Sequence, residues 1–236
     1  VGGAVERLSV GRIDPANEIR KYTAEIVAKS APVLDAKGLA LLEEDLRSPC
    51  TEEIAVFRAF ADQVALGETG FVVLDTAPTG HTIRLLQLPG AWSGFLESGK
   101  GDASCLGPLA GLEKQRSQYK AAVDALADPA RTRLTMVARA QRSALREAER
   151  THVELAAIGL GQQHLVINGV MPETEAAGDV LAAAICRREQ AALAEMPVPL
   201  RSLPTDHVAL KPFNLVGVAA LRGLLDDAAP PIAAAP

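Results

Sequence analysis

Residues 70–82 constrain the fold of this chain more than any other stretch. Four consecutive apolar residues, 71–74, predict a short strand that is buried on both faces, as in parallel sheets. Asp75 follows at the carboxyl end of this strand, where open parallel sheets bind their ligands. A carboxylate there can hold the water shell of a nucleotide-bound Mg²⁺, because a hard cation prefers oxygen ligands. An ordinary strand-to-helix junction would also place an Asp after an apolar run.

The residues after Asp75 are specific enough to suggest a family. They continue Thr-Ala-Pro-Thr-Gly-His-Thr, a loop that stays close to a ligand and can shift when the ligand changes. The whole string resembles the signature of the arsenical pump-driving ATPases and of related ATPases that deliver tail-anchored membrane proteins. The resemblance implies an α/β fold, a P-loop NTPase-like parallel sheet with helices on both faces. It also implies that Asp75 is catalytic and that Thr76 and Pro78 contact ATP and Mg²⁺.

The resemblance covers most of the chain and changes at the signature. Residues 8–60 are similar to the second half of an arsenite-pump ATPase, and residues 83–225 are similar to the first half of the same two-halved family. The supporting stretches are residues 12–15, 41–57, 103–108 and 165–170. We interpret this order as a natural recombinant gene or an assembly artefact, which sequencing of the source DNA across the junction would decide.

Composition excludes several classes of function. The net charge of −5, from 24 Lys and Arg and 29 Asp and Glu, is spread without long runs, so we expect no nucleic-acid partner. No run of 18 apolar residues and no signal peptide occur, and three unpatterned Cys make no disulfide framework. We expect a cytoplasmic protein, and the resemblance implies a peripheral place at the inner face of the plasma membrane. Because the chain begins at Val1, we interpret it as a fragment.

The hydrophobic pattern predicts one partial domain, residues 1–227, followed by a disordered Ala- and Pro-rich tail at 228–236. Within it we predict a helical segment (1–68), the signature strand, loop and helix (69–96), a loop and helix with a candidate metalloid Cys (97–127), and the rest of the sheet (128–227). Further strands are predicted at residues 134–138, 164–167 and 208–210, joined by helices. This alternation favours a parallel sheet with right-handed crossovers.

The sequence lacks the motif that would bind the phosphates of a nucleotide. That motif is Gly-x-x-x-x-Gly-Lys-Ser/Thr between a strand and a helix. Residues 94–101 nearly fit, but Gly101 stands where the Mg²⁺-binding hydroxyl is required, and the segment follows the predicted Asp75 strand. In the resembled family the true loop lies upstream of the residue that matches Arg12. We therefore expect the N-terminal phosphate-loop unit to be missing and the chain alone to be inactive.

Two short motifs are candidates for binding the adenine base. Asn168 is predicted just past a strand, where its amide can both donate and accept hydrogen bonds. In the resembled family the matching Asn binds the base, whereas the local sequence is explained equally well by an Asn-Gly turn. Pro204 and Thr205 are candidates for the loop that covers the adenine, and a plain turn is the simpler local explanation.

Two cysteines are candidates for binding a metalloid. Soft thiolates bind soft metals, and trivalent arsenic and antimony are sulfur-seeking in the same sense. Cys50 lies one residue into a helix predicted to start at Ser48, and Cys105 lies in a Gly-rich loop. The resemblance implies that Cys50 and Cys105 are metalloid ligands and that Ser48 and His81 line the same site. A lone Cys is more often a small buried apolar residue, and Cys186 is expected to be one.

Three functions are compatible with these patterns. The first is an ATPase subunit that binds arsenite or antimonite as an allosteric metalloid and energises a membrane arsenite efflux pump, together with a second ATPase half or a second copy. The second is a targeting ATPase for tail-anchored membrane proteins, which needs an apolar, often Met-rich groove and commonly a Cys-x-x-Cys pair. Only three scattered Met and no Cys-x-x-Cys occur, so the pump ATPase is favoured. The third is an inactive truncated fragment.

Overall fold

The computed structural model describes residues 5–76 and 109–224. The chain divides into two compact units, which we treat separately. The helical unit comprises Arg12–Thr132 and Leu155–Gln162, and the sheet unit comprises Val1–Gly11, Arg133–Glu154 and Gln163–Pro236. The predicted boundary after residue 127 falls close to the start of the second segment of the sheet unit.

Several sequence predictions fall on residues outside the described part of the chain. They concern Pro78, His81, Cys105, the near-match to a phosphate loop at residues 94–101, the helix expected after the signature, and the tail at 228–236. These predictions stay open.

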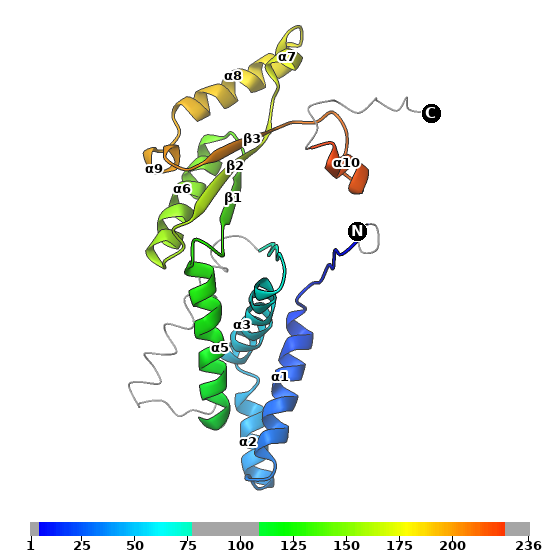
Figure 1. Cartoon of the computed structure of the whole chain (residues 1–236), viewed down its shortest axis with the longest axis vertical. Coiled ribbons are helices and arrows are strands. Elements are labelled where there is room, and N and C mark those ends of the chain that lie inside the picture. Colours follow the sequence, from blue (N-terminus) through cyan, green and yellow to red (C-terminus); the bar gives the residue numbers. More distant parts are fainter. Residues whose placement is uncertain (1–4, 77–108, 225–236) are drawn as a thin grey trace. The chain divides into compact units, whose positions relative to one another are not determined.

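The described residues of the helical unit contain four helices and a short 3₁₀ turn (Figure 1). They are α1 (Pro15–Ser30), α2 (Ala36–Asp45), α3 (Pro49–Ala65), η1 (Leu66–Glu68) and α5 (Leu109–Ala127). Residues 5–14 are not helical, whereas most of residues 15–68 lie in helices, and α3 starts at the predicted Ser-Pro pair. Ser48 has the extended backbone of a helix cap and a proline occupies the first turn.

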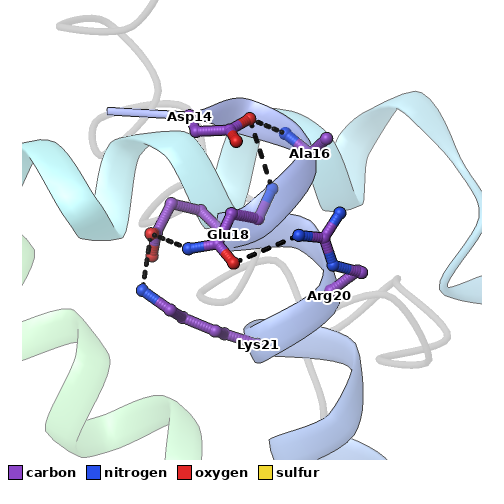
Figure 2. A network of polar contacts seen from close by, with 6 residues as sticks. Asp14, Ala16, Glu18, Arg20 and Lys21 are labelled. Carbon is purple, nitrogen blue, oxygen red and sulfur yellow. Dashed lines mark hydrogen bonds and ion pairs between the residues drawn. The ribbon is translucent and has the colours of Figure 1, made fainter. Parts of the chain in front are cut away.

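Helix α1 begins where the sequence supplies a capping carboxylate. Asp14 Oδ1 accepts hydrogen bonds from the backbone N–H groups of Ala16 at 3.1 Å and Asn17 at 3.4 Å (Figure 2). These bonds satisfy donors that have no partner within the helix. One turn on, Lys21 Nζ donates to Glu18 Oε1 at 2.8 Å on the surface. The cap therefore fixes where the first helix starts.

Two buried clusters hold the helical unit together. The first joins α1 and α3 with the residue after α2, and its members are Tyr22, Ile26, Leu46, Ile54 and Ala55. The second joins α3 and α5, and its members are Phe57, Ala61, Val64, Tyr119, Ala122 and Ala125. The rings of Phe57 and Tyr119 meet edge to face, with centroids 5.1 Å apart and planes at 77°.

The sheet unit contains a three-stranded parallel sheet in the order β1-β2-β3 (Figure 1). The strands are β1 (Leu134–Ala138), β2 (Gln163–Val170) and β3 (Thr205–Ala209). Helix α6 (Arg142–Ala157) connects β1 to β2, and α7 (Glu173–Ala176), α8 (Val180–Ala194) and α9 (Val198–Arg201) connect β2 to β3. Helix α10 (Val218–Arg222) follows. The prediction of parallel strands joined by helices is confirmed for this unit.

In the described residues of the sheet unit, helices pack against one face of this sheet, and the prediction of helices on both faces stays open. Sheet residues Met136, Ala138, Leu165 and Ile167 share one buried cluster with Leu145 and Ala148 of α6 and Ala192 of α8. On the opposite face, Val137 is 63% exposed. The strands follow each other in one direction, and right-handed crossovers that advance in one direction lie on the same side. The crossovers within this sheet would cover its second face only if the order of the strands reversed.

Residues 71–74 do not form the predicted buried strand. They have no regular structure, and Phe71 and Val73 are 95% and 79% exposed. Leu74 is partly buried against the cluster around Phe57. An apolar run becomes a doubly buried strand only when strands on both sides bond its backbone, and none of the described strands pairs with it. Asp75 therefore follows an extended segment of the helical unit.

Candidate functional site

The three described strands of the sheet unit have their carboxyl ends at the same edge, where β2 and β3 extend a few residues beyond β1. Ala138 at the end of β1 pairs with Ile167, and the next residue of β2, Asn168, pairs with Val208 near the end of β3. Arg139 directly follows β1 and is exposed. The carboxyl ends of parallel strands are where open α/β sheets bind ligands. This edge is the candidate functional site of the sheet unit.

Asn168 lies within β2, not just past a strand as predicted. The strand continues to Val170 through a β-bulge, in which the register to β3 shifts between Asn168 and Val170. Gly169 is the extra residue and has a φ of +68°. A Cβ on Gly169 would lie 3.0 Å from Nη1 of Arg139, so the guanidinium rests directly on this glycine. The Asn-Gly turn considered from the sequence is therefore wrong.

The exposed amide of Asn168 can recognise a purine. A side-chain amide offers an acceptor oxygen and donor hydrogens side by side. The same pair of groups recognises adenine through one of its ring nitrogens and its exocyclic amine. The side chain at this edge therefore suits the base of an adenine nucleotide.

Pro204 and Thr205 do not lie beside Asn168, which corrects their predicted role in covering the base. Thr205 begins β3 opposite Leu165, and the carbonyl of Pro204 accepts from the Leu165 N–H at 2.9 Å. Since Asn168 pairs three positions further along β3, Thr205 is about 10 Å from it at the strand rise per residue. β3 starts three residues earlier than predicted, which moves these residues to the amino end of the sheet.

The segment that does follow β3 at the carboxyl edge begins with Leu210. Its N–H donates to the carbonyl of Val170 at 2.7 Å, and the half-buried Lys211 comes next. Arg139 and Lys211 could have been singled out from the sequence, because each stands within two residues of a strand end. Glu189 of α8 was also missed in the sequence analysis. The one signal for its burial was its position three residues after Cys186, on the same side of the helix.

Ser48 and Cys50 lie together at the start of α3. Cys50 is exposed in the first turn, and the Ser48 hydroxyl is 3.3 Å from the hydroxyl of Thr51. Cys186, in contrast, is buried on α8, as expected of a structural residue. Across residues 5–76 and 109–224, no three His, Cys, Asp or Glu side chains gather in a way that could hold a metal ion. In the described part of the chain, Cys50 is thus the one exposed thiol.

Comparison with known proteins identifies the family. Residues 4–227 match the family model described as anion-transporting ATPase. This chain belongs to the anion-transporting ATPase family. It is 56% identical to an arsenical pump-driving ATPase of Acidiphilium multivorum over 226 residues, which are 94% of this chain and 39% of the relative. The same values hold for an arsenical pump-driving ATPase of Escherichia coli. ATPase GET3A of Arabidopsis thaliana is 28% identical over 70% of this chain and 53% of the relative.

The chain spans 39% of the length of the arsenical pump-driving ATPases that it matches. An alignment keeps the order of residues in both proteins, so a match over 94% of this member of the anion-transporting ATPase family weighs against a rearranged order. The rearrangement stays a prediction for DNA sequencing. Among the described helices, none combines the length and apolar character that crossing a membrane requires.

Proposed function

We propose that this chain is the switch and adenine-binding part of an ATPase that binds arsenite or antimonite and energises a membrane efflux pump. The observation that supports this most is the family match over residues 4–227. The carboxyl edge of the sheet adds a chemical reason, because the exposed amide of Asn168 lies there and the Arg139 guanidinium packs on the next residue, Gly169. The proposed location is the cytoplasm, peripheral at the inner face of the plasma membrane beside the pump subunit.

In this proposal Asn168 binds the adenine base and Arg139 lies close enough to contact the base or the ribose. Asp75 and Thr76, both exposed, hold the water shell of Mg²⁺ with Pro78 shaping the loop. ATP with Mg²⁺, when bound, would supply the terminal phosphoryl group, which the ATPase reaction transfers to water. Asp75 is also the proposed switch residue.

The phosphates of ATP would be held by residues outside this sequence, because it contains no complete Gly-x-x-x-x-Gly-Lys-Ser/Thr motif. A second ATPase half is the proposed source, because a second copy of this sequence would also lack the motif. Phosphoryl transfer depends on preorganised donors around the phosphates. The chain alone is therefore expected to hydrolyse ATP no faster than its Asp75→Asn variant.

The proposed metalloid site contains Cys50 and Cys105 as ligands, with Ser48 and His81 beside them. One chain offers only part of this site, so antimonite should bind weakly and tighten when a second half is added. Cys50→Ala and Cys105→Ala should each abolish the tight phase, and Cys186→Ala should leave it intact. The thiols lose protons on binding, so affinity should fall as pH drops.

The targeting ATPase for tail-anchored membrane proteins is less well supported. The arsenical pump-driving ATPases are 54–56% identical to this chain over 94–95% of its length. The relatives named GET3A and GET3 are 26–28% identical over 70–71%. The higher identity over the longer stretch favours the pump-driving function.

A nucleotide titration tests the base-binding role. We expect Mg²⁺-ATP to bind the full chain weakly in ligand-observed NMR, and Asn168→Ala to weaken binding about tenfold, as loss of one bidentate amide contact does. Thr205→Val is the matched control, because its hydroxyl donates to the Leu203 carbonyl at 3.0 Å at the other end of the sheet. Equal weakening by both variants would contradict the proposed site.

A further inference from the structure

Glu189 is a buried carboxylate that core packing does not explain. It is 3% exposed and, in the described part of the chain, is the one acidic residue that is buried. The other buried residues of α8, Cys186 and Ala192, are small and apolar. Burying a carboxylate is costly unless hydrogen bonds compensate for lost hydration. Glu189 Oε2 accepts such a bond from the backbone N–H of Met171 at 2.8 Å.

The bond to Met171 fixes the chain at the point where it leaves β2. Met171 directly follows Val170, the last residue of the strand, whose carbonyl accepts from Leu210. One residue earlier, Gly169 is held against the Arg139 guanidinium. Three consecutive positions after Asn168 are thus each restrained by a different element, and the bond that Glu189 accepts is the one made by a buried side chain.

We infer that Glu189 is a positioning residue for base recognition. Its carboxylate holds the end of the β2 bulge so that the Asn168 amide faces the adenine in one orientation. Glu189 acts through the backbone of residues 169–171 and does not touch the base. The inference rests on the proposed adenine-binding role of Asn168, and it adds a residue from a different element to that site.

A neighbouring contact provides a matched control. Gln190 Nε2 donates to Glu173 Oε1 at 2.7 Å, which joins α8 to α7 within the same connection. This bond is exposed and does not reach β2. If this part of α8 had a purely structural role, losing either contact should change the preference between nucleotides in the same way. If Glu189 positions Asn168, only the loss of the Glu189 contact should change that preference.

The test compares two nucleotides, Mg²⁺-ATP and Mg²⁺-GTP, by ligand-observed NMR titration of the full chain. We expect the wild type to prefer ATP about tenfold, the size of discrimination that one bidentate amide contact supplies. Glu189→Ala should reduce this preference to about twofold by weakening ATP alone, since the amide no longer presents a fixed pattern to the base. Glu189→Gln should keep most of the preference, because an amide oxygen can still accept from the Met171 N–H. Gln190→Ala should match the wild type.

Glu189→Asp covers the case in which Glu189→Ala does not fold. It keeps the charge but withdraws the carboxylate by one methylene, so it should lose the preference for ATP as Glu189→Ala does. If Glu189→Asp weakens ATP and GTP equally and keeps the tenfold ratio, the positioning role is wrong and the role of Asn168 stands. A wild type that does not distinguish ATP from GTP would overturn both proposals.

Discussion

The core of the helical unit contains aromatic rings, whereas the core of the sheet unit is aliphatic. Phe57 is fully buried between α3 and α5, where it meets the ring of Tyr119. Burial holds the pKa of the Tyr119 hydroxyl well above its ordinary value. In the sheet unit, Leu165 and Ile167 of β2 pack against Leu145 of α6. The largest fully buried side chains are thus Tyr22, Phe57, Leu46 and Ile54 in the helical unit, and Leu145, Leu165, Ile167 and Leu200 in the sheet unit.

The two units also differ in how they present functional groups. The sheet unit places Arg139 and Asn168 by strand register and by a bulge, so their positions follow from backbone geometry. The helical unit presents Cys50 on the exposed first turn of a helix. A side chain on a sheet edge is preorganised by its neighbours, whereas one on a helix start needs a second element to complete a site.

The largest expected effects come from truncating one large buried side chain in each core. Phe57→Ala should destabilise the helical unit by about 3–5 kcal/mol, because it leaves a cavity and removes the contact with Tyr119. Leu165→Ala should destabilise the sheet unit by about 2–5 kcal/mol. Hydrogen exchange measured by mass spectrometry should show faster exchange in α3 and α5 for the first variant, and in β1 and β2 for the second. Equal acceleration of both units by either variant would contradict the division into two cores.

Local sequence signals predicted the elements whose ends depend on nearby residues. The bounds of β1 agree with the prediction at both ends, and α3 begins at the predicted Ser-Pro pair. A proline and a capping residue determine the start of a helix within one turn. The short run Leu134–Ala138 lies between Arg133 and Arg139, so both ends of the strand are marked by nearby residues. These signals require no knowledge of the rest of the fold.

Sequence analysis failed where the outcome depends on distant partners. Residues 71–74 have the composition of a buried strand, but a strand exists only where another strand pairs with it. Pro204 and Thr205 were assigned to the wrong end of the sheet because the start of β3 is set by its register with β2. Glu189 was missed because its partner, the Met171 N–H, is 18 residues away.

The second prediction tests whether the sheet edge depends on backbone conformation. Gly169→Ala should destabilise the sheet unit by about 2 kcal/mol, because a φ of +68° is strained for any residue with a Cβ. The new methyl group would also push against Arg139. Urea unfolding followed by circular dichroism measures the loss, and Gly161→Ala, which has open space around it, is the control. Equal losses of stability from both substitutions would show that this position of the bulge does not require glycine.

The third prediction compares helix starts in the two units. Asp14→Ala and Asp179→Ala should each cost about 1 kcal/mol, because each carboxylate accepts from backbone N–H groups of the first turn. Ser48→Ala should cost less, since its hydroxyl pairs with Thr51 and makes no cap bond to the backbone of α3. Thermal unfolding of the three variants gives the order. A larger loss for Ser48→Ala would mean that its contact with Thr51 stabilises the helix start more than a cap does.

The smallest expected effect concerns Glu25 of the helical unit, which forms ion pairs with Lys29 and Arg58. Glu25 Oε1 accepts from Lys29 Nζ at 2.5 Å, and its Oε2 accepts from Arg58 Nη1 at 2.5 Å. These bonds to Lys29 and Arg58 hold the pKa of Glu25 below its ordinary value. A lowered folded-state pKa contributes stability that is present above the ordinary pKa and is lost as pH falls through the folded value. Since the Glu25 side chain is 33% exposed, the contribution should be about 0.5 kcal/mol.

Wild type and Glu25→Gln should therefore differ most near neutral pH and converge as pH falls through the lowered pKa of Glu25. Urea unfolding at a series of pH values from neutral to acidic measures the difference. Arg58→Met removes one partner and should reduce, but not abolish, the pH-dependent difference, because Lys29 remains. A difference that grows toward acidic pH would have the wrong sign for a stabilised carboxylate and would contradict the role of this ion pair.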